Sequence, residues 1–194
     1  MKHTDRPVFF MCAMTIKIPS LLHEVLGERQ SPGGLVLVGL LSAALALLWL
    51  PAIAHQGDLA IWRKILAGLL LLDIAAGAVA NLTAGTNAFY ATRPAHRWGF
   101  IVLHIHLPVL AVLLGQPLGP YLLVWAYTIG AAVTVNLLHG RPVQRPVAGG
   151  LLCLGLMGLP LLALDGLGMA ASLLFLFKVA YAFAVNHAPG QPDA

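Results

Sequence analysis

Residues 35–54 have the sequence LVLVGLLSAALALLWLPAIA, a run of 20 residues without a charged side chain. A helix of about 20 residues rises about 30 Å, which is the thickness of the hydrocarbon core of a bilayer. Five more apolar stretches follow it along the chain, at 61–82, 97–115, 118–138, 147–164 and 167–186. The sequence therefore predicts an all-α polytopic membrane protein with six transmembrane helices.

The composition supports the same class of protein. Of the 194 residues, 59% are hydrophobic and only 9% are charged, whereas about a quarter of the residues of a soluble domain are charged. We expect one transmembrane domain over 35–187, a cytoplasmic segment over 1–34 and a cytoplasmic tail over 188–194. Within the first segment, residues 18–29 place their apolar side chains on one stripe, which predicts a short interfacial amphipathic helix or, alternatively, a disordered tail.

The placement of basic residues predicts the topology, because lysine and arginine collect in the cytoplasmic loops of membrane proteins. The opposite side has only Arg63 and Lys64. The side that holds both termini has eight: Lys2, Arg6, Lys17, Arg29, Arg93, Arg97, Arg141 and Arg145. We therefore expect a multi-pass protein of the plasma (inner) membrane with both termini cytoplasmic. The arginines at 93, 97, 141 and 145 are expected to contact anionic lipid headgroups, and no nucleic-acid partner is expected.

Three asparagines end the even-numbered stretches in a similar way. They lie in VANLTAG at Asn81, TVNLLHG at Asn136 and AVNHAPG at Asn186, each followed four residues later by glycine. The shared spacing predicts three hairpins related by a parallel pseudo-three-fold repeat about an axis along the membrane normal. The alternative is that asparagine and glycine simply end helices one by one.

The repeat predicts a polar layer inside the bundle. Eight residues before these asparagines lie Asp73, Thr128 and Lys178, about 12 Å in from the helix ends at 1.5 Å per residue. His104 enters from the same side, seven residues after Arg97, at a depth of about 10 Å. An ionised side chain is costly inside a bilayer, so Asp73 and Lys178 are expected to form an ion pair.

Two histidines near this layer are expected to have different roles. His104 and His106 are two residues apart, and such positions on a helix point about 200° apart. His104 shares a face with Arg97 and is expected in the polar layer. His106 is expected to be a packing residue.

These residues predict a small channel or secondary transporter for protons or a small polar solute. The site would consist of Asp73, Lys178, His104 and Thr128, with Asn81, Asn136 and Asn186 at its cytoplasmic mouth. Secondary contributions are expected from Arg97, His139, His187 and Tyr181. No catalytic residue, cofactor or metal ligand set is predicted.

Two alternatives remain open. The first is a membrane-embedded redox or metal enzyme that uses the helix histidines, with haem or a metal at the surface histidines His96, His139 and His187. The second is a non-catalytic assembly subunit, either a homo-oligomer or bound to a membrane partner, in which the interior charges only hold helices together.

Overall fold

Helices make up most of the chain. The computed structural model describes residues 14–187, and the predicted tail 188–194 and the basic residues Lys2 and Arg6 lie outside these. The main helices are α2 (Pro32–Ala54), α3 (Ile61–Ala80), α4 (Ala84–Ala91), α5 (Pro94–Leu103), α6 (His106–Leu114), α7 (Leu118–Leu137), α8 (Gln144–Gly158) and α9 (Gly166–Leu176). Helix α8 ends in a 3₁₀ turn, η2 (Leu159–Leu161), and α9 continues into a π-helix, η3 (Phe177–Phe183).

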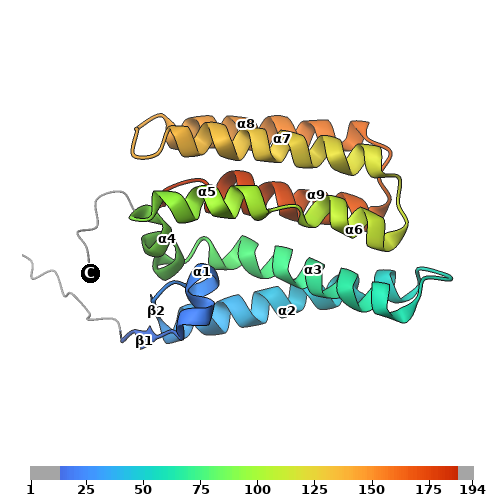
Figure 1. The fold of residues 1–194 in the computed structure, drawn as a ribbon, viewed down its shortest axis with the longest axis horizontal. Coiled ribbons are helices and arrows are strands. Elements are labelled where there is room, and N and C mark those ends of the chain that lie inside the picture. The colour runs from blue at the N-terminus through green and yellow to red at the C-terminus, as the bar shows by residue number, and fades with distance from the viewer. Residues whose placement is uncertain (1–13, 188–194) are drawn as a thin grey trace, which may run out of the picture.

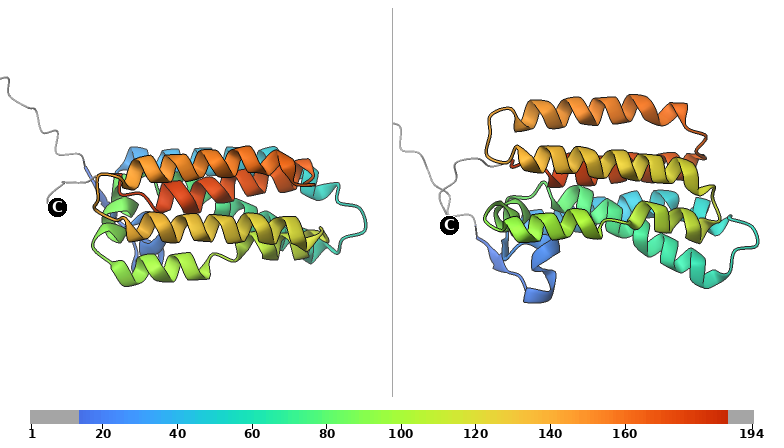
Figure 2. Two further views of the ribbon diagram at one scale, coloured as in Figure 1. Left: turned by 90° about the horizontal axis from the view of Figure 1, so that it is seen from above. Right: turned by 45° about the horizontal axis from the view of Figure 1, so that its top comes forward.

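The long helices lie along one common axis and alternate in direction (Figure 1). Residues 14 and 187 both lie at one end of the bundle, called the terminal end below. The π-helix and α9 lie in the centre and contact α3, α7 and α8. Helix α2 packs mainly on α3, and α8 lies at the opposite edge of the bundle (Figure 2).

Several helices are suited to cross a membrane. Four segments are long and apolar enough: Pro32–Ala54, Pro94–Leu114, Leu118–Leu137 and Gly166–Phe183. Helices α3 and α4 make a fifth if they count as one span, although they bend by 86° where they meet. The predicted all-helical architecture is confirmed. The sixth span and the hairpin repeat are not established.

Side-chain caps begin two of these helices. Ser31 precedes α2 and its hydroxyl accepts a hydrogen bond from the Gly34 N–H at 3.0 Å, while Pro32 supplies a favourable first residue. Asp165 precedes α9 and its carboxylate accepts from the Gly168 N–H at 2.6 Å. Both helices therefore begin at a cap visible in the sequence.

The third predicted span is interrupted after Leu103. Helix α5 ends there and α6 begins at His106. Pro108 accounts for the interruption, because it has no N–H to donate to the His104 carbonyl four residues earlier and its ring clashes with that carbonyl in a regular helix. The Trp125 indole N–H donates to this carbonyl instead, at 2.9 Å. The polar backbone group that the proline frees is thus satisfied by α7.

Residues 16–30, called the N-terminal cap below, form a small folded unit at the terminal end. Two short strands, β1 (Ile16–Lys17) and β2 (Arg29–Gln30), pair antiparallel around η1 (Ser20–Leu22) and α1 (His23–Leu26). The helix predicted over 18–29 is therefore shorter than expected.

The cap is bound to α4 rather than lying free. The Tyr90 hydroxyl donates to the Glu24 carbonyl at 2.8 Å, and the Thr86 hydroxyl donates to the Val25 carbonyl at 3.0 Å. An ion pair of 2.5 Å joins Arg93 to Glu28. Backbone contact at Gly27 and Gly85 lets the two segments approach this closely.

The three asparagines of the predicted repeat take unequal positions. Asn81 is the residue after α3, Asn136 lies in the last turn of α7, and Asn186 lies three residues beyond η3. The shared spacing therefore does not correspond to a shared place in the helices, and the repeat stays a prediction.

We expect Gly27→Ala to detach the N-terminal cap. Gly27 has φ +73° and ψ 179°, a conformation that is essentially restricted to glycine and costs other residues about 1–3 kcal/mol. A Cβ atom there would also overlap the Gly85 carbonyl. Trypsin cleavage at Lys17 and Arg29 should become faster. Gly33→Ala, which has open space around it, is the control, and equal cleavage rates for both variants would contradict the prediction.

Candidate functional site

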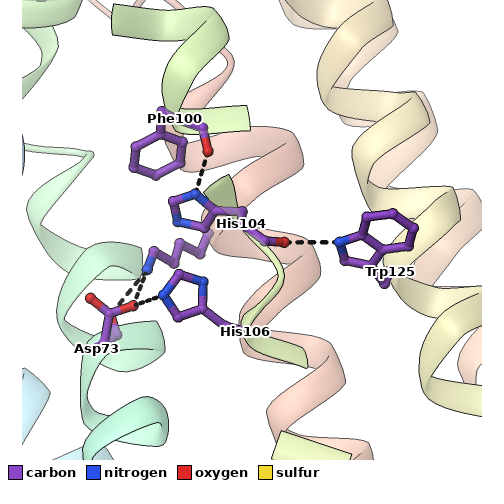
Figure 3. Close-up of polar contacts among 6 residues, drawn as sticks. Asp73, Phe100, His104, His106 and Trp125 are labelled. Atoms are coloured by element: carbon purple, nitrogen blue, oxygen red, sulfur yellow. Dashed lines mark hydrogen bonds and ion pairs between the residues drawn. The ribbon is translucent and has the colours of Figure 1, made fainter. Parts of the chain in front are cut away.

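The centre of the site is an ion pair between α3 and η3. The Lys178 Nζ lies 2.7 Å from the Asp73 Oδ2 and also donates to the Asp73 backbone carbonyl at 3.2 Å. Figure 3 shows the carboxylate beside the interruption in the third span. The ion pair expected from the matched depths of these residues is present.

The two partners differ in exposure. The Lys178 side chain is 3% exposed, whereas the Asp73 side chain is 46% exposed. The Lys178 stem passes over Gly77, one helical turn after Asp73, where a Cβ atom would collide with it. The ammonium is therefore enclosed by protein, and the carboxylate is open on one side.

His106 also lies at the ion pair, which corrects the expectation that His104 and His106 cannot face the same place. Its Nε2 lies 3.3 Å from the Asp73 Oδ2. The expectation assumed a continuous helix through residues 104–106, but the helix is interrupted there. The rings of His104 and His106 are consequently 4.8 Å apart, centroid to centroid, instead of on opposite faces.

His104 lies beside the ion pair without touching it. Its Nδ1 is 2.5 Å from the Phe100 carbonyl oxygen, and because a carbonyl only accepts, Nδ1 carries the proton. The Nε2 of this ring is then an acceptor, and it is buried without a hydrogen-bond partner. Stacking on Phe100 at 3.7 Å fixes the ring.

Other buried polar groups lie on α7 and α9, two helices that contact each other. Thr128 is fully buried, and its hydroxyl has no hydrogen-bond partner. The hydroxyls of Tyr121 and Ser172 are likewise buried and unpaired. Thr128 makes no direct bond to the ion pair, so the predicted layer of four residues is only partly assembled. Unpaired buried hydroxyls are places where ordered water commonly binds.

Of the three predicted mouth residues, one lines a cavity that the structure describes. Asn186 lines a small cavity at the terminal end together with Arg97 and His139. Asn81 and Asn136 are buried, and amide atoms of both lack hydrogen-bond partners. His187 donates to the Ala182 carbonyl at 3.1 Å, and its ring lies against Tyr181.

The arginines expected at lipid headgroups have partners within the protein. Arg93 pairs with Glu28, and Arg145 donates to the carbonyls of Asn186 and His187. Arg97 is largely buried. Contact with lipid stays a prediction, and it suits the exposed Arg141 best.

Several residues that shape this region were not predicted from the sequence. Trp125 holds the carbonyl of His104, and Gly77 makes room for the Lys178 stem. Gln144 is buried and donates to the carbonyls of Val135 and Ala184, at 3.2 and 3.1 Å. Only Pro108, four residues after His104, gave a usable indication, since a proline there predicts a freed carbonyl.

Among residues 14–187, no three histidine, cysteine, aspartate or glutamate side chains come together as a metal site would require. Comparison with protein-family models, curated proteins and solved structures finds no match to this chain. The functional interpretation therefore depends on the chemistry of the site itself.

Asp73→Asn should destabilise the protein more than the double variant Asp73→Asn/Lys178→Met. The single change leaves a buried ammonium without its carboxylate, which typically costs about 3–5 kcal/mol, whereas removing both charges is often nearly neutral. Unfolding in mixed detergent micelles measures the difference. Asp58→Asn, at an exposed aspartate, is the control. A double variant as unstable as the single one would contradict the role of the pair.

The stability of the terminal end should decrease in mild acid. Burial, and next the charge of Arg97, lower the pKa of His139, and burial lowers the pKa of His187. The folded protein thus binds fewer protons than the unfolded chain, so stability is complete above about pH 6.5 and is lost as the pH falls below it.

Thermal unfolding between pH 7.5 and 5.0 measures this loss. The variants His139→Gln and His187→Gln should each show a smaller decrease in midpoint than the unmodified protein, whereas His55→Gln, at an exposed histidine, should not. Identical pH profiles for all four proteins would show that His139 and His187 do not cause the loss of stability in acid.

Proposed function

We propose that the protein is a membrane channel or secondary transporter that moves protons or a small polar solute past Asp73. The observation that carries this proposal is the carboxylate that Lys178 and His106 share inside an apolar bundle, at 2.7 and 3.3 Å. Ionisable groups within membrane-spanning segments generally mark pathways for ions, protons or solutes.

The proposal includes six spans, with α3 as the second and α8 with η2 as the fifth. The alternating directions of the helices support this number (Figure 1). Basic residues at the terminal end outnumber Arg63 and Lys64 at the opposite end, which favours both termini being cytoplasmic in a plasma (inner) membrane. The six spans would then form the three hairpins of the repeat that the sequence predicts.

The exposure of Asp73 supports a pathway rather than a purely structural pair. A pair that serves only to join helices is best enclosed on both sides, because half-solvated charge in hydrocarbon is costly. The 46% exposed carboxylate instead needs water or a polar solute next to it.

The interrupted third span supports the same conclusion. Transporters commonly bind their substrates near the midplane, where broken helices expose backbone groups and helix ends. Here the interruption at residues 104–105 brings two imidazoles to the ion pair. A continuous helix would have directed one of them away.

The two histidines suit proton transfer. His106 has one nitrogen at Asp73, while its Nδ1 is buried without a partner, and the Nε2 of His104 is also unpaired. An imidazole can accept a proton at one ring nitrogen and donate one from the other. One water molecule between these nitrogens would connect Asp73, His106 and His104 in a chain.

Proton flux into proteoliposomes, followed with an enclosed pH-sensitive dye under a potassium diffusion potential, tests the proposal. We expect His106→Gln and the double variant Asp73→Asn/Lys178→Met to reduce the flux at least tenfold. His55→Gln, at an exposed histidine near the far end of the bundle, should keep full flux. If solute rather than protons is carried, the same variants should abolish its uptake.

A folded protein whose liposomes leak no faster than empty ones, to protons and to small polar solutes, would overturn the transport proposal. If the stability difference between the single and double variants were present in that case, the ion pair would act as a link between helices. The assembly-subunit alternative would then be favoured.

A further inference from the structure

Arg97 is a buried cation that pairs with no carboxylate in the described part of the chain. It is 8% exposed, and of its five N–H donors the one hydrogen bond found goes to the Ala91 carbonyl, at 3.3 Å. Its Nε has no partner. None of the ion pairs formed by residues 14–187 includes Arg97. Buried charges in proteins are normally paired, so this guanidinium needs a counter-ion.

A cavity of about 10 Å³ adjoins this guanidinium. Its volume is about that of one water molecule. Asn87, His139 and Asn186 also line it, and the Nδ1 of His139 is buried and unpaired. Among residues 14–187, those that line the cavity include no acidic side chain.

The lining comes from four separate parts of the chain. Asn87 belongs to α4 and Arg97 to α5, while His139 follows α7 and Asn186 follows η3. The Asn87 amide already joins two of these parts by donating to the Val185 carbonyl at 3.2 Å. Any ion in the cavity would therefore connect all four segments at the terminal end.

We propose that this cavity binds a small monatomic anion of the size of chloride, which is the counter-ion of Arg97. The positive charge of Arg97 favours an anion, and the small volume of the cavity favours a single atom over a larger oxyanion. The site is separate from the ion pair at Asp73, and the inference does not depend on transport.

The test uses the purified full chain in an uncharged detergent, at constant ionic strength, with chloride replacing gluconate. Thermal unfolding should show a saturable increase in midpoint, of about 3 °C or more, as chloride is added, because a ligand of the folded state stabilises it. Arg97→Gln should abolish the increase. Because it removes an unpaired buried charge, this variant should be at least as stable as the unmodified protein in gluconate alone.

Arg145→Gln is the matched control, since that guanidinium is already satisfied by the carbonyls of Asn186 and His187, and it should keep the chloride response. Arg97→Lys keeps the positive charge and should therefore keep part of the chloride response. This variant replaces Arg97→Gln in the test if the glutamine variant does not fold.

Equal midpoints in chloride and gluconate, or a chloride response that persists in Arg97→Gln, would overturn the proposal. So would stabilisation by phosphatidylglycerol nanodiscs or inorganic phosphate in place of chloride, because the ligand would then be a phosphate group. These readouts measure binding without flux, so their failure is distinguishable from failure of the transport proposal.

Discussion

A buried ammonium requires a carboxylate, and this requirement ties the centre of the bundle together. Lys178 lies on η3, which occupies the middle of the structure, and Asp73 lies on α3, which carries α2 on its other side. Gly77 provides the space that the lysine stem needs to reach its partner. Removing either the space or the charge would leave the ammonium in an apolar interior, where it is far less stable than in water.

The interruption of the third span gives this pair its chemical surroundings. Pro108 frees the His104 carbonyl, Trp125 satisfies it from α7, and the turn that results moves His106 to the carboxylate. A local backbone constraint thus brings an imidazole to the carboxylate. The same event fixes His104 through its bond to the Phe100 carbonyl, so one imidazole is held and the other faces the ionisable group.

Much of the helical plan was predictable, and the exceptions have physical causes. The helices were predictable from long apolar runs, and the start of α2 from Ser31 before Pro32. The ion pair was predictable from the matched depths of Asp73 and Lys178 in their helices. The expectation that His104 and His106 face opposite sides was wrong, because helical periodicity fails at an interrupted helix. The binding of the N-terminal cap to α4 depends on Gly27 and Gly85, which are remote in sequence, and no local pattern connects them. The cavity at Arg97 could not be predicted from the sequence either, because the residues that line it come from four separate segments of the chain.

The π-helical turns from Phe177 to Phe183 carry a consequence for the length of the chain. A π-helix holds more residues per turn than an α-helix, so this stretch accommodates additional backbone within the same rise. The wider turns absorb this additional backbone, so the helix before the stretch and the segment that leads to Asn186 keep the faces that an ordinary helix would give them. If the same residues wound as a regular α-helix, each residue not absorbed would rotate one of these segments by about 100° relative to the other. The winding between Lys178 and Asn186 therefore decides which way the lysine faces.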